Sequence, residues 1–140
     1  DEYMLYEAKL LGASAVLLIC SLLTPDTISS YLALCDSLGL SALVEAHDEQ
    51  EIANALSCGA RMIGVNNRNL KNFSVDTGNS GRLREFVPDS VLFVAESGIK
   101  TREDVAALEA KGVDAVLIGE TLMRASDKRA MLSQLKGLEV

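Results

Sequence analysis

Short apolar blocks recur along this chain, and each is preceded by a turn residue and separated from the next by a helical pattern. Glycine begins the segments at 12–19, 39–44, 59–65 and 112–119, while Pro88 precedes the block at 91–95. Near-continuous apolar runs are typical of parallel strands that are buried on both faces. The intervening segments carry apolar residues at the 3.6-residue period of amphipathic helices. The repeating unit is therefore one strand and one helix, which predicts a parallel α/β fold.

The ends of the helices can be predicted from capping residues. Residues 3–11 and 26–38 have the apolar spacing of helices, and a run of acidic residues starting at Asp48 opens a helix that ends before Gly59. Thr101 begins a capping box for a helix that closes at Gly112. We therefore expect one helix followed by five strand–helix units, all within a single domain that spans residues 1–140.

Charge and composition exclude several classes of partner. The 140 residues carry a formal net charge of −7 and contain no basic cluster, so nucleic acids and anionic membranes are poor partners. The longest apolar run, at 15–20, is too short for a membrane-spanning helix. Three cysteines without a Cys-x-x-Cys spacing favour a reduced, cytoplasmic setting, and one histidine among scattered cysteines predicts no metal site.

Polar side chains follow the predicted strands, just past the point where each strand ends. Glu45, Asn66, Glu96 and Ser97 occupy such positions. The carboxyl ends of barrel strands meet at one face, so we expect these residues to form a catalytic site there. A carboxylate that emerges from an apolar strand has a raised pKa, which makes Glu45 a candidate general base. The alternatives are a salt bridge inside the barrel for Glu45 and a polar turn without a ligand at 96–98.

Glycines at two successive strand ends suggest an anion site. Backbone N–H groups beside Gly98 and Gly119 could bind a phosphate, provided that the Glu120 carboxylate points away from it. The Arg68 guanidinium could orient a hydroxylated or carboxylated substrate. Asn67 and Asn69 are interpreted as turn residues. His47 is interpreted as a helix-capping or surface residue.

Five strings of this sequence, read in order, resemble the indole-3-glycerol phosphate synthase family. This family comprises decarboxylating cyclases, carbon–carbon lyases of tryptophan biosynthesis. The strings lie at 3–19 (YMLYEAKLLGASAVLLI), 43–47 (LVEAH), 63–70 (IGVNNRNL), 94–101 (VAESGIKT) and 116–124 (VLIGETLMR). Together they cover essentially the whole chain.

The resemblance implies an incomplete TIM-type (β/α)₈ barrel. Complete barrels have about 250 residues, and this chain corresponds to helix 3 through helix 8 of the family, with strands 4 to 8. The early-strand Glu and Lys residues of the family have no counterpart here, so we expect the isolated chain to be inactive. The substrate implied is a carboxyphenylamino-deoxyribulose phosphate, and no cofactor is required.

The resemblance also assigns roles to individual residues. It makes Glu45 the catalytic carboxylate of strand 5 and places Asn66 and Arg68 as polar contacts after strand 6. Glu96 and Ser97 take the strand 7 positions. The phosphate would be bound by backbone groups beside two glycines and the residue that follows the second, namely Gly98, Gly119 and Glu120.

An incomplete barrel should leave its two outer strands unpaired and expose apolar interior surface. We therefore expect self-association or pairing with the missing N-terminal barrel segment. Two other functions stay open at this point. One is a non-catalytic half-barrel scaffold, and the other is a different phosphate-binding barrel enzyme of the tryptophan or histidine pathways.

Overall fold

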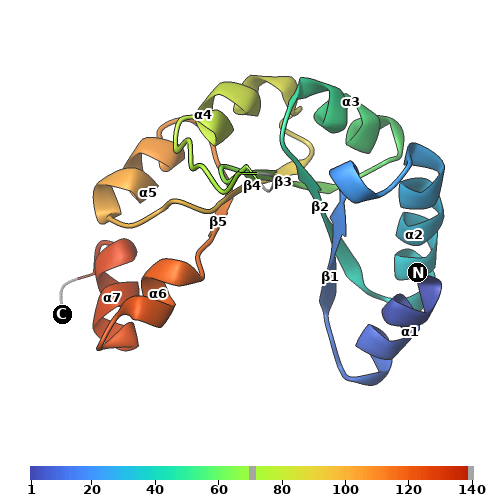
Figure 1. Ribbon diagram of the computed structural model, residues 1–140, viewed down its shortest axis with the longest axis horizontal. Coiled ribbons are helices and arrows are strands. Elements are labelled where there is room, and N and C mark those ends of the chain that lie inside the picture. The colour runs from blue at the N-terminus through green and yellow to red at the C-terminus, as the bar shows by residue number, and fades with distance from the viewer. Residues whose placement is uncertain (70–71, 139–140) are drawn as a thin grey trace.

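The computed structural model describes residues 1–69 and 72–138. Its five parallel strands form one sheet in the order β1-β2-β3-β4-β5, so each strand pairs with its neighbours in the chain. The strands are β1 (Ala15–Ile19), β2 (Ser41–Ala46), β3 (Met62–Asn66), β4 (Leu92–Glu96) and β5 (Ala115–Leu117). The sheet curves as an arch with the helices along its outer side (Figure 1). This confirms the predicted incomplete (β/α) barrel.

One helix precedes the sheet and the others follow successive strands. Two short 3₁₀ turns, at Cys20–Leu22 and Arg84–Phe86, complete the connections. The α-helices are α1 (Glu2–Leu10), α2 (Pro25–Leu38), α3 (Glu49–Ser57), α4 (Asn79–Leu83), α5 (Arg102–Glu109), α6 (Glu120–Arg124) and α7 (Lys128–Leu135).

The helix ends show how local side chains set the boundaries. The Asp48 carboxylate caps α3 by accepting a hydrogen bond from the backbone N–H of Glu51, and Thr101 forms a capping box with Asp104 at the start of α5. Both starts were predicted and are confirmed. Helix α2 begins one residue earlier than its apolar pattern, because Thr24 is the N-cap and Pro25 fits the first helical position.

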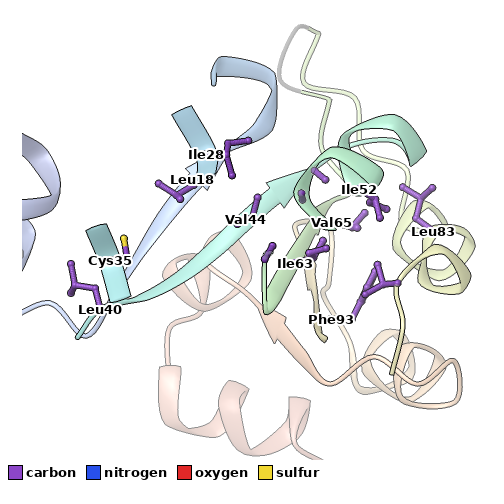
Figure 2. Packing of buried hydrophobic residues seen from close by; sticks show 14 of the residues in the cluster. Leu18, Ile28, Cys35, Leu40, Val44, Ile52, Ile63, Val65, Leu83 and Phe93 are labelled. Atoms are coloured by element: carbon purple, nitrogen blue, oxygen red, sulfur yellow. The ribbon is translucent and has the colours of Figure 1, made fainter. Parts of the chain in front are cut away.

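Alternate residues of the central strands face the helices and form the core. Val44, Ile63, Val65 and Phe93 are fully buried against α2, α3 and α4 (Figure 2). Since successive side chains of a strand point to opposite faces, the residues between them point to the concave inner side. Glu45, Gly64 and Glu96 lie there.

The two outer strands of the sheet each have one neighbour among the described residues. β1 pairs with β2, and β5 pairs with β4. Apolar side chains on the inner side stay about half exposed, namely Leu17, Leu92 and Leu117. The expected unpaired edges and exposed interior are therefore present in this part of the chain.

Two further expectations concern membrane-spanning helices and the state of the cysteines. Across residues 1–69 and 72–138, we find no helix with the length and apolar character needed to cross a bilayer. Cys20, Cys35 and Cys58 are all free thiols.

Candidate active site

Three of the predicted site residues lie inside the sheet: Asn66 and Glu96 end β3 and β4, and Glu45 is the second-last residue of β2. Glu45 pairs with Ile19 and Gly64, and Glu96 pairs with Asn66 and Leu117. The expectation that these residues lie past the strand ends is therefore wrong by a residue or two, because the parallel ladder extends through them. The ladder fixes their backbone and directs Glu45 and Glu96 toward the inner face.

Glu45 and Glu96 form a buried pair of carboxyl groups. Each residue is only 3% exposed, and the Oε1 atom of each receives no hydrogen bond from a described residue. Burial, the negative charge of Glu45 and a hydrogen bond with Glu45 together raise the pKa of Glu96 to about 7. Glu96 therefore keeps its proton up to about neutral pH, as a carboxyl group buried beside a second carboxyl group is expected to do.

Within the described residues, no Lys or Arg lies at ion-pair distance from Glu45, so a salt bridge of Glu45 inside the barrel would have to involve His47. The titratable neighbour of Glu45 on the same strand end is His47, whose Nε2 lies 3.4 Å from Glu45 Oε1. The other ring nitrogen, Nδ1, lies 3.3 Å from Oε2 of Glu51, and that oxygen also accepts a hydrogen bond of 2.8 Å from the backbone N–H of His47. The interpretation of His47 as the helix cap is wrong, because Asp48 is the cap, and the half-buried His47 ring lies between the carboxylates of Glu45 and Glu51.

A cavity of about 1100 Å³ lies beside this pair, between the loops that follow β3, β4 and β5. Glu45, Asn66 and Glu96 do not line it. The cavity gathers the other five predicted residues, which are Arg68, Ser97, Gly98, Gly119 and Glu120. Arg68 and Glu120, which lie 52 positions apart in the sequence, therefore meet at one place.

Glu120 connects two guanidinium groups at the edge of the cavity. Its Oε2 accepts a hydrogen bond of 2.8 Å from Arg68, and its Oε1 accepts one of 2.9 Å from Arg124. Arg124 and then Arg68 hold the pKa of Glu120 below its usual value. The carboxylate is thus committed to the two arginines, and it orients Arg68 at the cavity wall.

The turn after β4 has an unusual backbone. Ser97 and Gly98 both have positive φ angles, of 65° and 77°. A side chain at Gly98 would place its Cβ 2.5 Å from Val75 Cγ1, so glycine allows the loop after β3 to pack closely here.

Asn66 and Asn67 have different roles from each other. Asn66 Oδ1 accepts a hydrogen bond of 2.9 Å from the backbone N–H of Arg68. Asn67 is 3% exposed, and its amide donates to the Ser97 carbonyl (3.1 Å) while accepting from the Ser80 N–H (2.9 Å) and hydroxyl (2.7 Å). The interpretation of Asn67 as a simple turn residue is wrong: it holds the loops after β3 and β4 against α4. Leu70, the last residue of the IGVNNRNL string, lies outside the described residues.

Comparison with known proteins identifies the family. The family model described as indole-3-glycerol phosphate synthase matches residues 1–135. The chain belongs to the indole-3-glycerol phosphate synthase family. It is 58% identical over 137 residues to the indole-3-glycerol phosphate synthase of Ruminiclostridium cellulolyticum, covering 98% of this chain and 53% of that protein. It is 55% identical to that of Leuconostoc mesenteroides, covering 98% and 52%.

The chain spans about half the length of the curated synthases that it matches. Solved structures with low sequence identity share the fold. 3-Hexulose-6-phosphate synthase from Salmonella typhimurium matches with a TM-score of 0.78 at 18% identity, over 94% of this chain and 65% of that one. Thiamine phosphate pyrophosphorylase from Pyrococcus furiosus matches with a TM-score of 0.74 at 20% identity, over 93% and 61%.

Proposed function

We propose that this chain forms the C-terminal part of an indole-3-glycerol phosphate synthase barrel, equivalent to helix 3 through helix 8. The completed barrel would convert 1-(2-carboxyphenylamino)-1-deoxyribulose 5-phosphate to indole-3-glycerol phosphate. The observation that carries this proposal is the buried Glu45–Glu96 pair beside a cavity lined by Gly98 and Gly119. The family match supports this function over another barrel enzyme of the tryptophan or histidine pathways.

The reaction requires acid and base groups in one site. A bond forms between the ring carbon that carries the carboxylate and the ketone carbon of the sugar, and CO₂ then leaves from that ring carbon. The former ketone oxygen leaves as water while a proton is removed from the new ring. Glu45 would act as the base. Glu96 retains a proton near neutral pH and would act as a proton donor.

The remaining residues would bind and orient the substrate. Backbone N–H groups beside Gly98 and Gly119 would bind the phosphate, since a Cβ at Gly119 would meet no atom within 4 Å and the space there is open. Arg68, held by Glu120, would contact substrate hydroxyl or carboxylate groups. Asn66 and Ser97 would supply further polar contacts. The scheme uses no cofactor and operates in the cytoplasm.

The exposed edges of the two outer strands, β1 and β5, indicate which kind of segment the chain would pair with. Among residues 1–69 and 72–138, β1 and β5 each have one edge without a paired strand, and Leu17 of β1 and Leu117 of β5 are about half exposed. In our proposal these edges pair with the N-terminal barrel segment, or with a second copy when that segment is absent. The 140 residues alone would be inactive, because the resemblance places the needed Lys and Glu residues on earlier strands.

Turnover can be measured directly because the chain contains no tryptophan. Product formation from the carboxyphenylamino-deoxyribulose phosphate would be followed by indole fluorescence, with the chain alone and after mixing with a segment that supplies strands 1 to 3. We expect no turnover alone and measurable turnover in the mixture.

The control is Glu45→Gln in the same mixture, which should abolish turnover without changing association. Turnover by the 140 residues alone would overturn the proposed inactivity. Binding of phosphate with no turnover in any mixture would instead support the scaffold alternative.

A further inference from the structure

The two carboxyl groups of the active-site pair come from strands that are not neighbours. Glu45 is on β2 and Glu96 is on β4, with β3 between them. Neighbouring strands lie about 4.8 Å apart, so about 10 Å of sheet separates the two backbones. The side chains can meet only by passing over the inner face of β3.

The residue of β3 at this crossing is Gly64. Gly64 is directly opposite Glu45 of β2 on one side and Val94 of β4 on the other. Val94 lies two positions before Glu96 on β4, so the two side chains point to the same face. A Cβ added to Gly64 would overlap Glu96 Oε1 and would lie 3.0 Å from Glu96 Cδ. The Glu96 carboxyl group therefore occupies the volume in which every other amino acid would carry its side chain.

We propose that Gly64 is a positioning residue, whose missing side chain provides the space in which Glu96 crosses β3 to reach Glu45. Gly64 has an ordinary negative φ angle, so its backbone conformation does not require glycine. It sits inside a strand, where glycine is disfavoured. The space above the Gly64 Cα, which the Glu96 carboxyl group fills, explains why glycine occupies this position.

The groups around the pair come from three elements. His47, after β2, lies next to Glu45, and Glu51 of α3 lies next to His47. Cys20 follows β1. Burial is the main cause that raises the pKa of its thiol to about 12, and the carboxylates of Glu51 and Glu45 raise this pKa further. None of these groups crosses β3, so Glu96 depends on Gly64 for its contact with Glu45.

The first test is a double-mutant cycle measured by urea unfolding. Gly64→Ala should lower the urea midpoint in the wild-type background but have a much smaller effect in the Glu96→Ala background, where the overlap is gone and only Leu43 Cδ1, at 3.2 Å, stays close. Equal losses in the two backgrounds, or unfolding in both, would overturn the proposal. If Gly64→Ala unfolds alone but folds with Glu96→Ala, the proposal is supported.

The second test titrates the Glu carboxyl carbons by ¹³C NMR. Wild type should show a carboxyl group that titrates near 7, and Gly64→Ala should move that titration toward the ordinary value of 4.5. Gly81→Ala is the control, because the three atoms nearest to the new methyl group all belong to the flexible Lys111 side chain. An unchanged titration in folded Gly64→Ala would refute the role of Gly64.

Only the use of this pair in turnover rests on the proposed function. Neither test needs substrate, so a chain that proves inactive in every mixture can still show the coupling between Gly64 and Glu96. Conversely, an active barrel in which the cycle is additive would refute the positioning role and leave the proposed activity intact.

Discussion

Replacing Glu96 by Gln should change how the stability of the chain depends on pH. The pKa of Glu96 rises from 4.5 to about 7 on folding. Below about pH 4.5 the group is protonated in both states, and between the two values only the unfolded state loses its proton. The free energy of unfolding therefore falls as pH rises through this window. Each tenfold change in proton affinity is worth about 1.4 kcal/mol, so the fall amounts to about 3 kcal/mol.

Glu96→Gln has no proton to lose, and its amide can still donate a hydrogen bond to Glu45. The stability of this variant relative to wild type should therefore increase by about 3 kcal/mol between about pH 4.5 and about pH 7.5. Urea unfolding at a series of pH values measures this difference, and other titrating groups contribute similarly to both proteins. Glu85→Gln, at an exposed carboxylate, is the control and should track wild type. A difference that is flat, or that decreases with pH, would refute the assignment of the proton to Glu96.

Three further changes can be measured with the same chain. Asn67→Ala leaves buried partners unsatisfied and should reduce the free energy of unfolding by about 2–3 kcal/mol, measured in urea; a change below about 1 kcal/mol would contradict its bracing role. Ser97→Gly relieves a left-handed backbone and should raise stability by about 1 kcal/mol in the same assay, whereas a loss would show that the hydroxyl matters more. Glu120→Gln removes a negative charge at the cavity and should tighten binding of inorganic phosphate about two- to threefold, measured by NMR titration; weaker binding would show that orienting Arg68 matters more than the charge.

Features that depend on a few adjacent residues were predictable from the sequence. The Thr101 capping box and the Asp48 cap were found because their partners lie three residues away. The alternation of strands and helices placed Glu45 and Glu96 on one rim of the sheet. Their strand positions were misjudged because the length of a parallel ladder is set by its neighbours, which a single segment does not reveal.

Roles that depend on distant partners were missed. Asn67 acts through Ser80 and Ser97, which lie 13 and 30 positions away, so it could not be told from a turn residue. Gly64 did carry a signal, because a glycine in the middle of an apolar strand indicates the close approach of another group. The sequence does not show that this group is a carboxyl from two strands away.

The strands lie in the sheet in the same order as in the chain, and this order affects how fast the protein folds and which parts fold first. Each strand pairs with the strand that precedes or follows it, so most long-range contacts join adjacent strand–helix units. Folding should therefore spread from unit to unit without waiting for distant segments to meet, and it should be fast for a parallel sheet. Amide hydrogen exchange should be slowest in β3, which has neighbours on both sides at the centre, and should quicken progressively toward β1 and β5.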